Sequence, residues 1–137
     1  VKGMKKTIEV VGAAIVDGNR VLAAQRKKSS QPHNSLKWEF PGGKVEADES
    51  HEKAIVREIR EELGIEIIPI KELTRIRHDY AKFTLDMTVL LCTIVDGEEP
   101  KCLEHNKIAW VAERELRSID WAEADRKILP DLVTILR

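Results

Sequence analysis

The sequence predicts one domain in which a mixed β-sheet packs between helices, an α/β or α+β architecture. Its 137 residues suit a single domain, because domains usually contain about 100–200 residues. Strand-like segments dominate, and only two segments have the character of helices, one in the middle of the chain and one at its end. Because strands and helices do not alternate strictly, a purely parallel sheet is not expected.

Composition and charge exclude several classes of protein. Hydrophobic residues make up 42% of the chain and charged residues 34%, which is typical of a folded chain rather than a disordered or collagen-like one. No apolar run approaches the roughly 20 residues that a transmembrane helix needs, so no membrane partner is expected. The 23 Lys and Arg and 24 Asp and Glu residues leave a net charge of −1, which gives no general attraction to nucleic acid polymers.

The N-terminus and the cysteines set the expected domain limits and compartment. Val1–Gly3 precede Met4 and are interpreted as a non-native remnant, which leaves one domain over residues 4–137. No signal peptide is expected. Cys92 and Cys102 form no disulfide framework and no metal-binding pattern, so a reduced, cytoplasmic location is expected.

The first part of the chain predicts a hairpin and a loop. Residues 7–16 are rich in Val, Ile and Ala and predict a buried strand. The turn Asp17-Gly18-Asn19 leads to a return strand over residues 20–26. Residues 27–37 are polar, with Ser, Pro and Asn, and predict a loop.

Two short segments then lead into the strongest helix signal of the chain. Trp38-Glu39-Phe40 alternates like a strand, and Pro41-Gly42-Gly43 is expected to end any regular element. Ser50 is a suitable N-cap and Gly64 a suitable C-terminal cap. Between them, apolar residues recur every four positions and form one stripe along the helix: Ile55, Ile59 and Leu63.

After this helix the pattern returns to strands. Residues 65–70 and 73–78 predict two strands around Pro69, and residues 83–95 predict a long one. A turn over residues 96–100 ends this group.

The C-terminal part predicts a short strand and a helix. Residues 108–111 are the last strand-like run, and residues 121–136 read as a helix that Pro130 is expected to weaken or kink. Its inward-facing side chains are expected to be Ile128, Leu129, Leu132, Ile135 and Leu136.

Three glutamates share one face of the central helix. Glu58, Glu61 and Glu62 stand at spacings of three and four residues, beside the apolar stripe rather than opposite it. Their carboxylates are therefore expected to lie close to the protein body, where like charges repel. Arg57 can pair with Glu61, and a divalent cation would compensate the remaining charge. Carboxylate oxygens suit Mg²⁺ or Mn²⁺ better than zinc.

A solvated surface of Glu and Arg is the usual explanation for a fragment such as REIREEL alone. This fragment belongs to a longer run from Gly43 to Ile65, GKVEADESHEKAIVREIREELGI. The run matches without departure the pattern G-x5-E-x7-R-E-U-x-E-E-x-G-U, where U is aliphatic. A chance match is on the order of 10⁻⁹ per start position at typical residue frequencies. The pattern is the Nudix box, so the sequence resembles the Nudix hydrolase superfamily.

The resemblance extends over most of the chain. Residues 37–46, KWEFPGGKVE, resemble the MutT-type branch, which includes the bacterial CTP pyrophosphohydrolases. The resemblance implies the Nudix α/β/α sandwich. It also implies a Mg²⁺-dependent enzyme, with Mn²⁺ as a substitute, that converts a nucleoside triphosphate into a monophosphate and pyrophosphate. Such an enzyme would serve nucleotide pool sanitation and DNA repair as a monomer or homodimer.

Within the box, the resemblance implies a role for each matching residue. It implies that Arg57 orients the helix carboxylates and that Glu49 ties the preceding loop to the helix. The implied metal ligands are three side chains and one backbone carbonyl: Glu58, Glu61, Glu62 and Gly42.

Outside the box, Glu104 lies six residues before Trp110, where similar enzymes place a further metal ligand or the catalytic base. A solvated loop acid is the alternative for Glu104. Whether Glu58 or Glu104 takes the proton from water stays open, because the base varies within the family.

Four residues are candidates for substrate binding. Arg26 resembles the substrate-contacting Arg of the family, with a plain surface residue as the alternative. Trp38 and Phe40, with the region around Tyr80, are either walls of a base pocket or ordinary core. Asp125 stands where similar enzymes read the base, with a favourable acid in the first helical turn as the alternative. An ionised carboxylate accepts hydrogen bonds and the exocyclic amine of cytosine donates them, so Asp125 favours CTP, dCTP and 5-methyl-dCTP.

Three other functions compete with this one. They are an 8-oxo-dGTP hydrolase of the MutT type, an ADP-ribose or dinucleotide hydrolase, and a Nudix domain used only for binding. The short chain disfavours the second and the intact box disfavours the third. No P-loop is present, and the scattered His33, His51, His78 and His105 are expected to be surface or loop residues rather than metal ligands.

Overall fold

The structure is a computed structural model that describes residues 5–137. The interpretation of residues 1–3 as a remnant therefore concerns a segment outside the described residues. The elements follow in the order β1 (Lys6–Asp17), β2 (Arg20–Gln25), β3 (Trp38–Glu39), β4 (Gly42–Lys44), α1 (His51–Leu63), β5 (Ile67–Asp79), β6 (Phe83–Ile94), β7 (Lys107–Ala112), the 3₁₀ helix η1 (Glu113–Ser118), α2 (Glu123–Arg126) and α3 (Leu129–Leu136).

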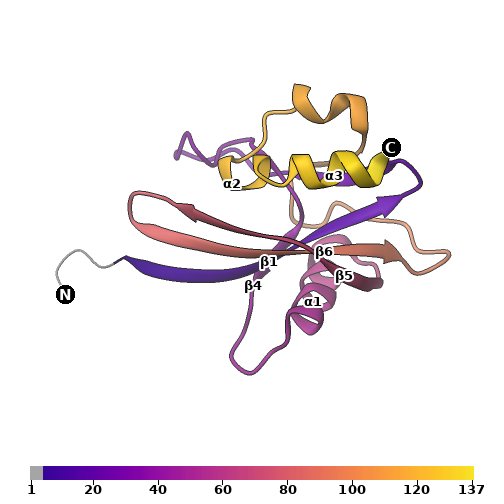
Figure 1. The fold of residues 1–137 in the computed structure, drawn as a ribbon, viewed down its shortest axis with the longest axis horizontal. Coiled ribbons are helices and arrows are strands. Elements are labelled where there is room, and N and C mark those ends of the chain that lie inside the picture. The colour runs from indigo at the N-terminus through magenta and orange to yellow at the C-terminus, as the bar shows by residue number, and fades with distance from the viewer. Residues whose placement is uncertain (1–4) are drawn as a thin grey trace.

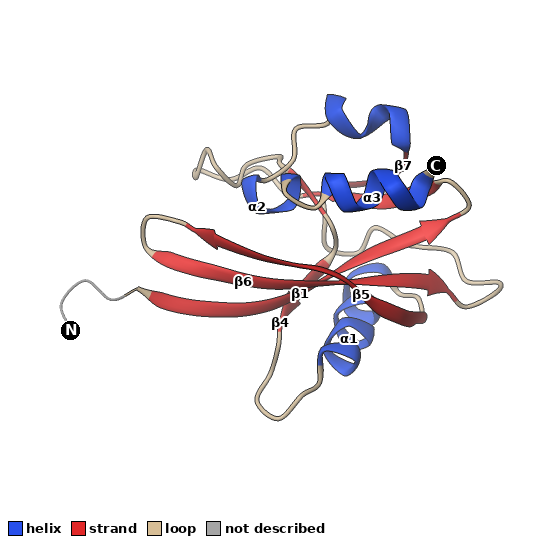
Figure 2. Ribbon diagram, viewed as in Figure 1, coloured by secondary structure: helices blue, strands red, loops and turns tan. Residues whose placement is uncertain are grey.

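The strands form one mixed sheet, as the sequence predicts. The order is β3-β2-β1-β6-β5, with β4 paired to β1 and β7 paired to β2. β1 and β6 run parallel, while β1 is antiparallel to β2 and β4. Helix α1 lies on one face of the sheet and helices α2 and α3 on the other, which confirms the α/β sandwich (Figures 1 and 2).

β1 separates two apolar cores because its side chains alternate between the two faces of the sheet. Val11, Ala13 and Ile15 pack with the buried stripe of α1. Ala14 faces the opposite core, which contains Trp121 and the inner residues of α2 and α3. The helix that carries the box is thus anchored to the same strand that supports the C-terminal helices.

Both predicted caps of α1 are present. The Ser50 side chain accepts a hydrogen bond from the Lys53 backbone, and Gly64 closes the helix with a left-handed φ of 63°. The predicted stripe of Ile55, Ile59 and Leu63 is fully buried. These buried residues fix the rotation of α1 about its own axis, and this rotation sets the direction in which its carboxylates point.

β3 ends at Glu39, just before Pro41-Gly42-Gly43, as predicted, but the two glycines were not expected to lie in a new strand. Gly42–Lys44 forms β4 and pairs with Val10–Gly12 of β1. A Cβ atom on Gly42 would overlap the carbonyl oxygen of Val11, so the absence of a side chain is what lets the two backbones approach.

The two strands predicted around Pro69 are a single strand, β5. It has register shifts between Pro69 and Lys71 and between Glu72 and Thr74. β5 lies at the edge of the sheet, where a residue without an N–H and small bulges are tolerated.

The predicted C-terminal helix is interrupted. α2 ends at Arg126 and α3 begins at Leu129, with Pro130 in the first turn of α3. Proline cannot donate to the preceding turn, so the helix restarts rather than kinks. Of the five expected inward residues, Ile135 is only half-buried. The 3₁₀ helix η1 was not predicted. No helix within residues 5–137 has both the length and the apolar character needed to cross a membrane.

Candidate active site

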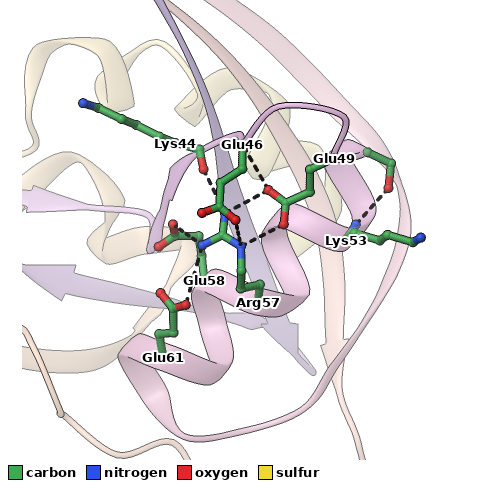
Figure 3. Close-up of polar contacts among 8 residues, drawn as sticks. Lys44, Glu46, Glu49, Lys53, Arg57, Glu58 and Glu61 are labelled. Atoms are coloured by element: carbon green, nitrogen blue, oxygen red, sulfur yellow. Dashed lines mark hydrogen bonds and ion pairs between the residues drawn. The ribbon is translucent and has the colours of Figure 1, made fainter.

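Arg57, in the middle of α1, is the centre of an ion-pair network (Figure 3). Its guanidinium donates to both carboxylate oxygens of Glu49 at 2.8 and 2.9 Å and to the backbone carbonyl of Lys44 at 3.0 Å. It also donates to Glu58 at 2.9 Å and lies 3.6 Å from Glu61. The Arg57 fork therefore joins the β4–α1 loop to the acidic face of the helix.

The three box glutamates differ in exposure. The Glu62 side chain is 5% exposed, Glu58 is 16% exposed, and Glu61 is 54% exposed. Glu58 and Glu62 thus lie close to the protein body as expected, whereas Glu61 extends into solvent. A Cβ atom on Gly43 would come within 2.5 Å of the Glu58 carboxyl, so the second glycine of β4 makes room for this carboxylate.

The most deeply buried acid of the helix face is Glu62. Burial raises the pKa of Glu62 well above its usual range, and a hydrogen bond with Glu58 and the negative charges of Glu58, Glu39 and Glu104 act in the same direction. An all-oxygen donor set of this kind fits a hard divalent cation. Within residues 5–137, no group of three His, Cys, Asp or Glu side chains is arranged closely enough to hold a metal ion.

A cavity of about 140 Å³ opens beside these carboxylates. Three of the four candidates for substrate binding line this cavity, together with the two glycines of β4. Its lining consists of Val10, Val11, Arg26, Glu39, Phe40, Gly42, Gly43, Leu85, Met87 and Asp125.

A larger cavity of about 630 Å³ is lined by the β1–β2 and β6–β7 turns, with Glu98 and Glu99. It includes no residue of the box. We therefore place the candidate site at the smaller cavity.

Arg26 is held by polar side chains at the edge of the small cavity. Its Nε donates to Glu39 at 2.7 Å, and its Nη1 donates to Asn34 at 2.6 Å. The other Glu39 oxygen lies 2.9 Å from Nε2 of His105. Burial disfavours the charged form of Glu39, but these hydrogen bonds outweigh burial and lower its pKa below the usual value.

Asp125 reaches the cavity from the far end of the chain. The backbone of Trp38 pairs with the segment before α2, through Asp120 at 2.9 Å and Ala122 at 2.8 Å. This pairing places Asp125 where one of its oxygens accepts the Phe40 N–H at 3.0 Å. Asp125 is 4% exposed, and burial, with the nearby charge of Glu39, raises its pKa to about 7.

The aromatic candidates divide between core and surface. The Phe40 ring stacks on Trp121 at 4.7 Å and belongs to the core, although Phe40 also lines the cavity. Trp38 is half-buried and lies outside the cavity lining. Tyr80 lines a neighbouring cavity of about 470 Å³ with His33 and Trp121, and it stacks on Phe83.

Glu104 lies in the β6–β7 loop, exposed but close enough to raise the pKa of Glu62. Two N–H groups of this loop bind the end of α1: Lys101 donates to the Leu63 carbonyl at 2.8 Å and Leu103 to the Glu62 carbonyl at 3.2 Å. The loop therefore follows the helix that carries the box.

Sequence reasoning missed two residues of this site, Glu39 and His105. His105 lies in a loop, as one of the two expected placements had it, but its side chain is only 8% exposed. The available signal for Glu39 was its place in the sequence: it is a charged residue between two aromatic residues in a short, strand-like segment. For His105 no local signal existed, since its partners come from other parts of the chain.

Comparisons with known proteins find relatives in one family. The NUDIX domain family matches residues 6–132. A Mycobacterium tuberculosis protein provisionally named 8-oxo-dGTP diphosphatase 2 is 38% identical over 128 residues, which cover 93% of this chain and 89% of that protein. The CTP pyrophosphohydrolase of Escherichia coli is 56% identical over 61 residues, 44% of each chain.

Solved structures show the same fold. The solution structure of the E. coli ORF135 protein superposes with a TM-score of 0.81 at 33% sequence identity. The alignment covers 98% of this chain and 94% of that one. The likeness therefore extends well beyond the box.

Proposed function

Because the chain belongs to the Nudix family as a MutT-like hydrolase, we propose that it is a Mg²⁺-dependent nucleoside triphosphate pyrophosphohydrolase that prefers cytosine nucleotides. The reaction is (d)NTP plus water to (d)NMP plus pyrophosphate, carried out by one domain over residues 4–137. The observation that carries this proposal is the buried acidic face of α1 directly beside a cavity lined by Arg26 and Asp125.

The metal would be held by carboxylates of α1 and its neighbourhood: Glu58, Glu61, Glu62 and Glu104, with the Gly42 carbonyl. When bound, Mg²⁺ supplies a positive field for the triphosphate and lowers the pKa of an attacking water. Arg57 orients Glu58 and Glu61 through its fork. Glu58 or Glu104 takes the proton of the water, and Arg26 binds the substrate at the cavity edge.

Asp125 supports the cytosine preference. One carboxylate oxygen accepts the Phe40 N–H, and Asp125 lines the cavity, where its carboxylate can accept a hydrogen bond from a ligand. In its ionised form this oxygen complements the exocyclic amine of cytosine, and a 5-methyl group leaves that edge unchanged.

The second candidate function is hydrolysis of 8-oxo-dGTP. A pKa of about 7 means that Asp125 is partly protonated at neutral pH, and a protonated carboxyl donates a hydrogen bond. It could then pair with O6 of an oxidised guanine. The relatives that bear the name 8-oxo-dGTP diphosphatase make this the strongest competitor.

The experiment is pyrophosphate release from CTP, dCTP, 5-methyl-dCTP, dGTP and 8-oxo-dGTP. We expect activity with Mg²⁺ or Mn²⁺, none in excess EDTA, and the highest kcat/KM for a cytosine nucleotide. A tenfold preference for 8-oxo-dGTP over every cytosine nucleotide would replace the cytosine proposal with the second candidate. Orthophosphate as the sole phosphorus product would contradict the proposed reaction itself.

The variant that tests specificity is Asp125→Asn. An amide both donates and accepts, so we expect the advantage of cytosine nucleotides over 8-oxo-dGTP to shrink severalfold. The control is Asp131→Asn, an exposed acid in the first turn of α3. An unchanged ratio of kcat/KM between the cytosine nucleotides and 8-oxo-dGTP in Asp125→Asn would show that Asp125 does not read the base.

A further inference from the structure

His105 is buried in the β6–β7 loop, between the end of α1 and the cavity. The loop is tied down before and after it. Before it, two N–H groups bind the last carbonyls of α1, and after it Asn106 donates its backbone N–H to Gln25 at 2.9 Å. The Asn106 side chain adds a bond to the Gln25 side chain at 2.7 Å. These anchors give the ring a fixed position.

The ring presents one nitrogen to two carboxylates. Nε2 lies 2.9 Å from Glu39 and 3.8 Å from Glu62. The pKa of Glu39 is lowered, so its ionised carboxylate only accepts hydrogen bonds and Nε2 is the donor of the shorter contact. The other nitrogen, Nδ1, is buried and has no hydrogen-bond partner within residues 5–137. Within the described residues, the polar contacts of the ring are therefore the two that Nε2 makes with Glu39 and Glu62.

Glu39 and Glu62 belong to the two halves of the site. Glu39 holds Arg26 at the substrate cavity through a 2.7 Å bond, while Glu62 belongs to the acidic face of α1. The imidazole contacts both carboxyl groups, and the charge of Glu39 lies close enough to contribute to the raised pKa of Glu62.

We propose that His105 is a positioning residue that holds the substrate-side and metal-side carboxylates in place at once. The proposal rests on the proposed function, because Glu62 is assigned there as a metal ligand and Arg26 as a substrate contact. Loss of the Nε2–H is expected to free Glu39, and with it Arg26, and to let Glu62 move away from its position on α1. Metal affinity and substrate affinity should therefore weaken together.

Two variants separate hydrogen bonding from space filling. His105→Leu keeps an apolar group of similar size but removes the donor, while His105→Gln keeps an N–H on a flexible chain. The matched control is His51→Leu, which removes a histidine–carboxylate pair, to Glu9 at 3.2 Å, whose two members do not line the cavity.

We expect His105→Leu to weaken the binding of Mn²⁺ to the nucleotide-free protein about tenfold, measured from the electron paramagnetic resonance signal of free Mn²⁺. KM for CTP should rise by a similar factor. His105→Gln and His51→Leu should stay within about threefold of the wild type in both measurements. Equal losses in His105→Leu and His105→Gln, or none in either, would overturn the proposal.

A third measurement needs no variant. Long-range ¹H–¹⁵N correlation spectra of the wild-type imidazoles should show a hydrogen on Nε2 of His105, and a bare Nε2 would overturn the proposal even if His105→Leu does not fold.

The experiments also distinguish a failure of this proposal from a failure of the proposed function. A wild type that binds Mn²⁺ with the expected difference between variants but hydrolyses no nucleotide would contradict only the proposed function.

Discussion

The acidic face of α1 and the cavity beside it are built in opposite ways. The acidic face comes from one continuous segment, in which Arg57 binds Glu49 eight residues away and Glu58 beside it. The cavity is assembled from distant segments, since Phe40 and Asp125 meet although 85 positions separate them. A local segment can be recognised as a pattern, whereas the cavity depends on the whole fold.

The two regions also differ in how their charges are balanced. On the acidic face, Arg57 compensates only the outer side of the cluster, and Glu62 remains buried beside Glu58. In the cavity, Arg26 and His105 both contact Glu39, so its charge is compensated within the protein. We infer that the acidic face depends on an added cation and that the cavity does not.

The largest effect is expected from breaking the acidic face. Glu58→Gln removes one charged oxygen ligand beside Gly43, and kcat should fall a hundredfold to a thousandfold, about 3–4 kcal/mol of transition-state stabilisation. The fold should survive, because one of several like charges disappears. Steady-state kinetics with CTP and the thermal unfolding midpoint measure the two outcomes.

The control for this experiment is Glu52→Gln, which changes an exposed glutamate in the first turn of the same helix. Its kinetics should match the wild type. Equal kinetics for Glu52→Gln and Glu58→Gln would mean that the acidic face is only a solvated surface.

A smaller effect is expected on the cavity side, from the ionisation of Asp125. Its pKa is raised from 3.8 to about 7, so the folded protein holds this proton more tightly than the unfolded chain does. The free energy of unfolding should therefore fall as pH rises from 5 through 7, by about 2–3 kcal/mol for this group. Asp125→Asn should lack this part of the pH dependence.

Urea unfolding of wild type and Asp125→Asn at pH 5, 6, 7 and 8 measures this difference. The free-energy gap between the two proteins should change steadily in favour of the variant up to pH 7 and then level off. A gap that is constant over this range would show that Asp125 is ionised throughout, and it would remove the argument for 8-oxo-dGTP.

The smallest effect is expected from the glycines that separate the two regions. Gly43→Ala forces the Glu58 carboxyl to move, because the new Cβ would come within 2.5 Å of it. We expect kcat to fall about tenfold, about 1.4 kcal/mol, with KM nearly unchanged. Gly12→Ala is the control, since its Cβ would meet Met87 Sδ at an ordinary 3.4 Å. Equal kinetics for Gly43→Ala and Gly12→Ala would mean that Glu58 tolerates displacement.

Sequence patterns were sufficient where structure depends on near neighbours. The caps and the apolar stripe of α1 are local, and so is the position of Arg57 against Glu49 and Glu61, so all of these were predictable. The hairpin of β1 and β2 follows from its turn in the same way.

The remaining features depend on partners that no local pattern contains. β4 exists because β1 offers it a backbone to pair with, and that partner lies about 30 positions earlier. The burial of His105 depends on Glu39 and Glu62, and the pKa of Asp125 depends on what covers it. Composition and spacing carry no information about these contacts.

The parallel pairing of β1 with β6 has a consequence for the order in which the protein folds. Lys6 pairs with Phe83 and Ile15 with Cys92, so this ladder closes a long chain loop that contains the whole box. Loops of this length are slow to close, because chain entropy opposes them before the ladder stabilises them. Helix α1 has its own caps and its contacts with the end of β4 are local, but the β6–β7 loop and α2 follow β6 in the chain and are expected to reach the site only after that closure. The site should therefore be among the last parts of the molecule to form, and metal binding should follow the slow phase of refolding rather than precede it.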